Sequence, residues 1–162
     1  MGRAIQTLSM GMEEEPFFAE IGQEHSRFIE LAWKMMLSNK DLLPILGELN
    51  PGHPLLLPAY ITKEALCSQG VSHWVEKPFV GREGAGISLM DRGDKLASGA
   101  PGHQNEPIVY QKHAPMFTAA AGRHFVWGLW MIGDECRCPS ARGATSPITG
   151  NLSRFFPHRL EG

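Results

Sequence analysis

The chain has 162 residues, of which 43% are hydrophobic and 20% are charged. This composition allows a packed core and excludes a chain that is disordered throughout. Lysine and arginine number 15 and aspartate and glutamate 17, and the net charge of −2 argues against a broad electrostatic surface for nucleic acid. No apolar run approaches the roughly 18 residues that a membrane-spanning helix needs. The three cysteines give no disulfide framework, which suits a reducing cytoplasm.

The N-terminal part predicts helices. Residues 1–22 are expected to form a poorly ordered segment, with a domain over residues 23–162. Apolar residues recur every three or four positions from Gln23 to Asn39, which predicts a helix. A second helix is predicted over Lys40 to Leu49, with Pro44 in its first turn, where a missing N–H costs little.

The middle of the chain predicts a short helix and then a hairpin. The helix is expected from Thr62 to Gln69, with Thr62 as its N-cap. A strand from Val71 to Phe79, a glycine-rich turn over residues 81–86 and a strand from Ile87 to Met90 together predict the β-hairpin.

Strands are also predicted in the C-terminal part. Asp91 to Glu106 is polar and is expected to be an exposed connection. Strands are predicted over Pro107 to Lys112 and Arg123 to Ile132, whereas the chain from Asp134 onward is expected to be irregular. Helices first and strands later predict an α+β fold. Residues expected in the core are Trp33, Met35, Met36, Trp127 and Trp130, with Cys67 as a buried, inert thiol.

The segment most informative about chemistry runs from Trp74 to Gly86. There a predicted strand delivers Lys77, and a glycine-rich turn begins four residues later at Gly81. Glycines let a backbone approach a ligand closely, and successive N–H groups can point at anionic oxygens. Lys77 and Arg82 would bring positive charge to the same polyphosphate. On spacing alone, a surface hairpin with ordinary basic residues is the simpler interpretation, because neither the Walker nor the dinucleotide motif is present.

Three blocks of the sequence resemble the synthetase domain of the glutathionylspermidine synthase family. That family has a fold of the ATP-grasp type, so the resemblance implies the C-terminal part of an ATP-grasp-like domain. The blocks follow the family's order and cover most of Ile29 to His158. The first block is Trp33 to Leu46, continuing through Pro51 to Pro54 and Leu56 to Tyr60; the second is Lys77 to Gly86; the third is Gly133 to Glu135 with Ser146 to Asn151 and Ser153 to His158.

The resemblance implies an ATP-dependent ligase. Family members join a carboxylate to an amine through an acyl phosphate, so ATP and Mg²⁺ are the implied cofactors, and glutathione or another carboxylate and a polyamine are the implied partners. Carried over by position, Lys40 and Lys77 would hold phosphates, a loop over Gly81, Arg82, Glu83 and Gly84 would cover them, and Gln111 would lie near the adenine. The alternatives are that Lys40 is a surface lysine at a helix start and that Gln111 is a solvated strand residue.

The chain also departs from the family's pattern. The family is longer, its magnesium ligands lie upstream of the matched part, and no segment here matches those carboxylates; no motif assigns Asp134 or Glu135 to a metal. Lys112 and His113 follow Gln111 where the family continues with an apolar stretch. Two hypotheses follow: a C-terminal piece of a ligase that lacks an N-terminal segment, or a degenerate ATP-grasp fold without ligase activity that serves as a binding or interaction module.

Overall fold

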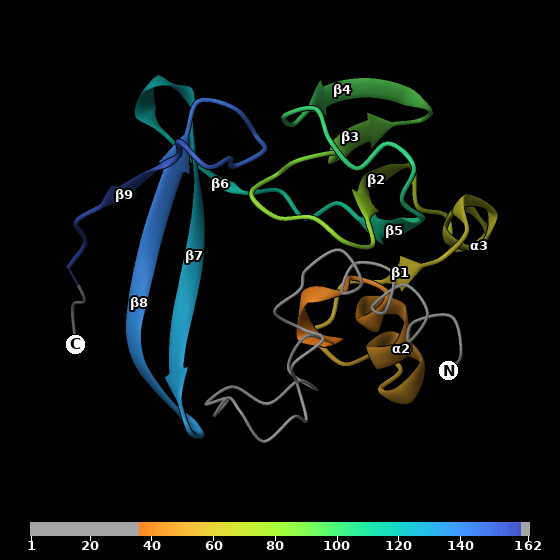
Figure 1. Ribbon diagram of the computed structural model, residues 1–162, viewed down its shortest axis with the longest axis horizontal. Coiled ribbons are helices and arrows are strands. Elements are labelled where there is room, and N and C mark those ends of the chain that lie inside the picture. The colour runs from red at the N-terminus through yellow and green to blue at the C-terminus, as the bar shows by residue number, and fades with distance from the viewer. Residues whose placement is uncertain (1–35, 160–162) are drawn as a thin grey trace, which may run out of the picture.

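The computed structural model describes residues 36–159. The expected poorly ordered segment over residues 1–22 lies outside this range, and so does most of the helix expected from Gln23 to Asn39; its last described residues, Met36 to Ser38, form a 3₁₀ turn. Two antiparallel sheets stand beside each other, and two short helices lie against the first (Figure 1). Sheets therefore dominate the described part of the predicted α+β fold. None of the described helices is long and apolar enough to cross a membrane.

The first sheet has five strands in the order β1-β5-β2-β3-β4. Every neighbouring pair is antiparallel. The predicted hairpin is confirmed, because β2 pairs with β3 through partners such as Trp74 and Met90. The strands are β1 (Ala59–Tyr60), β2 (His73–Pro78), β3 (Ser88–Asp91), β4 (Asp94–Ser98) and β5 (Ile108–Lys112).

The two faces of this sheet have different environments. Side chains alternate between the faces of a strand, so Trp74 and Met90 point to one face, where they pack with Leu66 of helix α3 (Lys63–Ser68) into the hydrophobic core. The next residues along β2, Val75 and Lys77, point to the other face. Because side chains along β2 alternate between the two faces, one face of the sheet packs the core and the other carries the candidate site.

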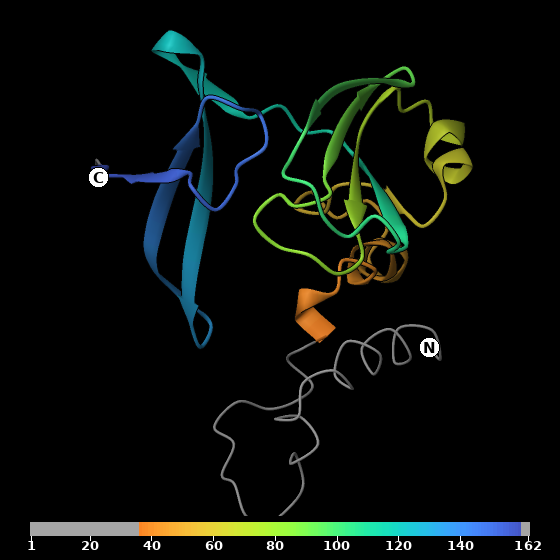
Figure 2. The same ribbon diagram turned by 45° about the horizontal axis from the view of Figure 1, so that its top comes forward.

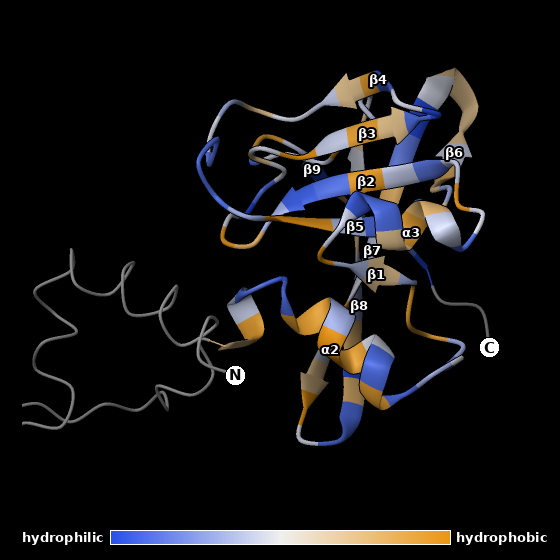
Figure 3. Ribbon diagram, turned by 90° about the vertical axis from the view of Figure 1, so that its right-hand side faces the viewer, coloured by the Kyte–Doolittle hydropathy of each residue, from blue (hydrophilic) through white to orange (hydrophobic). Residues whose placement is uncertain are grey.

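The helices predicted over Lys40 to Leu49 and Thr62 to Gln69 are confirmed, with bounds close to those expected. Helix α2 (Leu42–Leu49) is mostly hydrophobic and contains Pro44 in its first turn (Figure 3). Helix α3 begins after Thr62, whose side chain accepts a hydrogen bond from the Ala65 N–H at 3.3 Å. This N-cap satisfies one of the backbone donors that a helix leaves unpaired at its start.

The second sheet has four strands in the order β6-β7-β8-β9. Its centre is a long hairpin formed by two ten-residue strands, whose far end protrudes from the molecule (Figure 1). The bounds are β6 (Phe117–Ala119), β7 (Arg123–Ile132), β8 (Glu135–Ala144) and β9 (Arg154–Phe156), and a 3₁₀ turn, η3 (Ala120–Gly122), joins β6 to β7.

Two expectations about irregular segments are wrong. The stretch from Asp91 to Glu106 contains β4, because Arg92 and Gly93 both have positive φ and turn the chain tightly back along β3; such two-residue turns match the twist of paired strands. The chain after Asp134 contains β8 and β9 rather than an irregular tail, because β8 pairs with β7 along its whole length.

Several expected core residues are exposed. Trp127 and Trp130 are 53% and 65% exposed. Trp130 lies on the part of the β7–β8 hairpin beyond β9, whereas Trp127 lies beside β9 and its ring is 5.3 Å from the ring of His158. Met36 is 47% exposed, and the Cys67 thiol is exposed rather than buried. Trp33 and Met35 lie outside the described residues. An apolar pattern in the sequence predicts where strands form, but it does not predict which strands are covered by other helices or strands.

Three loops meet where the two sheets approach each other. Gly84 of the glycine-rich turn lies against the backbone of Thr149, which follows β8, and against Gly99, which follows β4. Figure 2 shows the glycine-rich turn and the segment after β8 approaching each other between the two sheets. A Cβ at position 99 would overlap the carbonyl oxygen of Gly84, and a Cβ at position 84 would lie 2.6 Å from the carbonyl oxygen of Thr149. Backbone atoms approach so closely only where side chains are absent.

We predict that Gly99→Ala destabilises the protein by about 1–3 kcal/mol, because the loop backbone has to move to admit the methyl group. Gly47→Ala is the matched control: no atom lies within 4 Å of a Cβ at this helical position, so the change should stabilise the protein by about 0.5–1 kcal/mol. Urea denaturation measures both. A Gly99→Ala variant as stable as the unmodified protein would contradict the packing described here.

Candidate functional site

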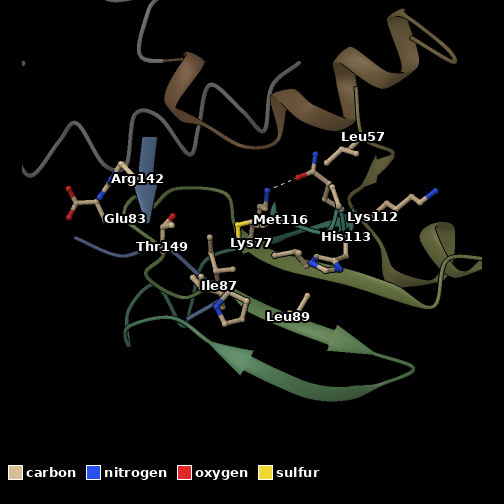
Figure 4. Close-up of a pocket in the computed structure, with 16 residues that line it drawn as sticks. Leu57, Lys77, Glu83, Ile87, Leu89, Lys112, His113, Met116, Arg142 and Thr149 are labelled. Carbon is tan, nitrogen blue, oxygen red and sulfur yellow. Dashed lines mark hydrogen bonds between the residues drawn. The ribbon is translucent and has the colours of Figure 1, made fainter. Parts of the chain in front are cut away.

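A pocket of about 310 Å³ opens on the face of the first sheet that is turned away from α3 (Figure 4). Its floor comes from β2, β3 and β5, and its walls come from the glycine-rich turn and from the segment that follows β8. The volume is at the lower end of the range of small-molecule sites. The lining residues used below are Leu57, Val75, Lys77, Glu83, Gly84, Leu89, Gln111, His113, Met116, Arg142 and Thr149.

Lys77 and Gln111 form the centre of the pocket. Val75 is the direct cross-strand partner of Gln111, so Lys77, two residues further along β2, points to the same face. The Lys77 Nζ donates a hydrogen bond of 2.5 Å to the Gln111 Oε1, and Gln111 is only 6% exposed. Burial, and secondarily the charge of Lys40, lowers the pKa of Lys77. The pocket thus holds a partly buried ammonium group that has no carboxylate partner among the described residues.

Lys40 lies close enough to this centre for its charge to act on Lys77. Its Nζ donates a hydrogen bond of 2.5 Å to the carbonyl oxygen of Gly81, and its backbone N–H donates to the carbonyl oxygen of Phe79 at 2.9 Å. Burial lowers the pKa of Lys40. Lys40 therefore anchors the start of the glycine-rich turn and adds positive potential near Lys77, and it is not among the residues that line the pocket.

The glycine-rich turn contributes only part of its length to the pocket. Glu83 and Gly84 line it, whereas Gly81 does not and Arg82 is exposed outside it. Gly84 is buried with φ +78°, and Glu83 has φ +57°. These positive φ values bend the turn over the pocket, and they are unusual for a residue such as glutamate.

Arg142 lines the pocket and was missed by the sequence analysis. It lies on β8, and its Nη2 donates a hydrogen bond of 2.9 Å to the carbonyl oxygen of Gly150, while its guanidinium lies 5.3 Å from the centre of the Phe155 ring. Its Nε is buried and has no partner among the described residues. A guanidinium has five N–H donors, and its Nη groups are the ones that could also serve an anion in the pocket.

The two ends of the pocket differ in character. Arg142, Glu83 and Thr149 lie at one end in Figure 4, and the apolar side chains of Leu57, Leu89 and Met116 lie towards the other, with Lys77 between them. His113 joins the apolar end, and burial, followed by the charge of His73, lowers its pKa. Such a site suits a ligand with a flat or apolar part joined to a polyanion.

Comparison with known proteins agrees with the resemblance drawn from the sequence. The pattern described as glutathionylspermidine synthase preATP-grasp matches residues 10–161. The chain belongs to the glutathionylspermidine synthase family. It is 39% identical over 150 residues to a protein of Haemophilus influenzae that is named as an acid–amine ligase, and 30% identical over 135 residues to trypanothione synthetase of Crithidia fasciculata.

The matches cover most of this chain and much less of the relatives. They span 88% of the chain but 37% of the Haemophilus protein, and 83% of the chain but 20% of the Crithidia protein. The chain therefore spans well under half the length of these relatives.

We predict that the buried ammonium of Lys77 makes stability depend on pH. Because its pKa is lowered from the ordinary 10.5, the folded protein releases this proton at a lower pH than the unfolded chain does. The free energy of unfolding should therefore rise with pH between the lowered pKa and 10.5. Urea denaturation at a series of pH values measures this slope.

Lys77→Met should reduce this rise, because methionine has no proton to release. Lys95→Met, on the exposed strand β4, serves as the control and should leave the slope unchanged. Equal slopes for the unmodified protein and Lys77→Met would contradict the burial of the ammonium.

Proposed function

We propose that this chain binds ATP in the pocket around Lys77, as the nucleotide-binding part of a carboxylate–amine ligase that acts through an acyl phosphate. The observation that carries the proposal is the meeting of two cations from different sheets, Lys77 on β2 and Arg142 on β8, beside the backbone of Gly84 in one pocket. A polyphosphate is the ligand that such a group of donors binds best. The family and its named relatives support the same class of reaction.

Each part of the proposed ligand has a place in the pocket. The phosphates would lie between the Lys77 ammonium, the Arg142 guanidinium and Gly84. The adenine would lie among Leu57, Leu89 and Met116 at the apolar end. Gln111 is fixed through its Oε1 by Lys77, which leaves its amide N–H groups to donate to a purine edge.

Lys40 would act indirectly. Its bond to the carbonyl oxygen of Gly81 holds the entrance of the glycine-rich turn, and the turn covers the proposed phosphate position. The expected contact of Lys40 with phosphate stays a prediction, and Arg82, which is exposed, would contact phosphate only if the turn moved. Positioning by a closed loop excludes water, which protects an acyl phosphate from hydrolysis.

Magnesium is the cofactor that the family implies, and its fit can be tested on the side chains present. Mg²⁺ is usually held by one or two carboxylates and by phosphate oxygens. The described residues contain no group of three histidine, cysteine, aspartate or glutamate side chains that would hold a metal, and Glu83 is the one carboxylate among the lining residues described. The described residues therefore contain no cluster of three such side chains, and of the pocket lining only Glu83 could offer a carboxylate to Mg²⁺ beside phosphate oxygens. The proposal rests on phosphate binding.

An interaction module without ligase activity is the second candidate function. The observation in its favour is the protruding hairpin, on which Leu129, Trp130, Met131 and Ile132 are each at least 55% exposed. Exposed apolar patches of this kind mark contact surfaces. ATP binding separates the candidates: the ligase part requires it, and the interaction module does not.

We predict that ATP stabilises the chain and that Lys77→Ala abolishes the effect. Ligand at a hundred times its dissociation constant should stabilise the folded state by about 2.7 kcal/mol. Removing the ammonium takes away the central phosphate contact, so the melting temperature of the variant should not change with ATP. Thermal unfolding with and without ATP and Mg²⁺ measures both shifts.

Arg142→Gln should weaken the shift in the same experiment, and Lys95→Ala, which changes a lysine outside the pocket, should preserve it. A Lys77→Ala variant with the full ATP shift would refute the proposed site. No shift in the unmodified, folded protein would favour the interaction module. Formation of ADP together with an acid–amine conjugate would extend the proposal from binding to ligation.

A further inference from the structure

A second pocket, of about 580 Å³, lies at the end of the other sheet. Its lining comes from the start of β7, the end of β8, the start of β9 and the segment between β8 and β9. Neither the sequence motifs nor the comparisons assign it a ligand. The residues that line it are Arg123, Gly143, Ala144, Thr145, Ser146, Ile148, Gly150, Leu152, Ser153, Arg154 and Phe156.

The second pocket shares a wall with the pocket around Lys77. Pro147 and Thr149 line the first pocket, Ser146 and Gly150 line the second, and Ile148 lines both. This five-residue segment therefore separates the two cavities by one thickness of chain. A ligand in the second pocket would lie beside the proposed nucleotide without competing for its place.

All charged side chains that line the second pocket are positive. Arg123 and Arg154 are its charged lining residues, and no carboxylate lines it. The guanidinium of Arg123 lies 5.0 Å from the centre of the Phe156 ring, which holds it at the wall. Neither arginine takes part in an ion pair within residues 36–159. Both guanidinium groups are therefore available to a ligand.

Hydroxyl groups add further donors of defined orientation. The Ser146 Oγ accepts the N–H of Ile148 at 3.2 Å, and the Ser153 Oγ accepts the N–H of Gly150 at 2.9 Å. Each hydroxyl uses its oxygen as an acceptor, so its own hydrogen remains free to donate to a ligand. The same bonds fix the loop that carries these side chains, so the donors are held in place before a ligand arrives.

The floor of the pocket also has a fixed shape. Gly143 is buried between aromatic rings, and a Cβ at this position would lie 2.8 Å from Phe156 and 2.9 Å from Phe125. The two rings pack edge to face with their centres 5.1 Å apart. The glycine lets β8 approach the rings, and Phe156 in turn supports Arg123.

We propose that this second pocket is a binding site for the oxyanion group of a small ligand, either a carboxylate or a phosphate. Forked guanidinium donors and hydroxyl donors, with no acidic side chain among them, match the planar or tetrahedral oxygens of these groups. The inference goes beyond the proposed ATP site, because it concerns different residues. Binding energy gained there would hold a ligand next to the nucleotide without touching the phosphates.

The test is calorimetric titration of the folded chain with inorganic phosphate and, separately, with succinate. The titrations are made on the Lys77→Ala variant, so that anions entering the first pocket contribute little. We expect saturable binding of at least one of the two anions, and the one that binds identifies the source of the oxyanion. Raising the chloride concentration should weaken this binding, since charge contributes to it.

Substitutions decide whether the second pocket is responsible. Arg154→Gln and Arg123→Gln should each weaken binding at least tenfold, whereas Arg137→Gln, at the far end of the β7–β8 hairpin, should change it less than twofold. If Arg154→Gln does not fold, Arg154→Lys replaces it: lysine keeps the positive charge but lacks the forked guanidinium donors, so binding should be weakened to an intermediate degree. Absence of saturable binding by both anions, or binding that survives both glutamine substitutions, would overturn the proposal. Because Lys77 is already replaced, either result is independent of the ATP site.

Discussion

The constraint on which the site depends is the burial of the Lys77 ammonium without a carboxylate beside it among the described residues. Removing a charged group from water is costly, and among the described residues the bond to the Gln111 Oε1 is what offsets this cost. Lys40 adds a second positive charge nearby, which makes the position less favourable for a cation and more favourable for an anion. A polyanion that entered the pocket would relieve both charges. Burial and the neighbouring charge thus disfavour the ammonium form of Lys77, and a bound phosphate would favour it.

The strand pairing of the first sheet explains how this arrangement is maintained. The same alternation that sends Trp74 into the core sends Val75 and Lys77 to the opposite face. The pairing of β2 with β5 then brings Gln111 within reach, although it lies 34 residues away along the chain. Closure of the pocket depends on the contact of Gly84 with Thr149, which links the glycine-rich turn to the second sheet. The register between β2 and β5 therefore determines both which side chains pack in the core and which ones line the pocket.

Local sequence signals predicted much of the fold. The N-cap at Thr62, the proline in the first turn of α2 and the glycine-rich turn after β2 each act over a few residues, so they can be read without a tertiary context. Strand β8 could not be predicted in this way, because its Cys, Arg, Pro, Ser and Gly residues show no apolar alternation. Its conformation comes from pairing with β7. The turn at Arg92 and Gly93 did carry a local signal, a glycine between two short segments, and β4 was missed because its residues are mostly polar.

The candidate site was predicted in part for the same reason. Lys77, Glu83, Gly84 and Gln111 were named from the resemblance and come together in one pocket, whereas Arg142 belongs to the strand that was not predicted. Its contribution appears only when the second sheet is placed beside the first. Lys40 and Arg82 do not line the pocket. The direction of a side chain decides this, and the spacing of residues in the sequence does not define that direction.

The most direct measurement is a crystal structure of the chain with a non-hydrolysable ATP analogue. The account predicts phosphate oxygens within hydrogen-bonding distance of the Lys77 Nζ and the Arg142 guanidinium, with Gly84 against them and the adenine near Gln111. An analogue bound elsewhere, or phosphates that leave the Lys77 ammonium without contact, would contradict it.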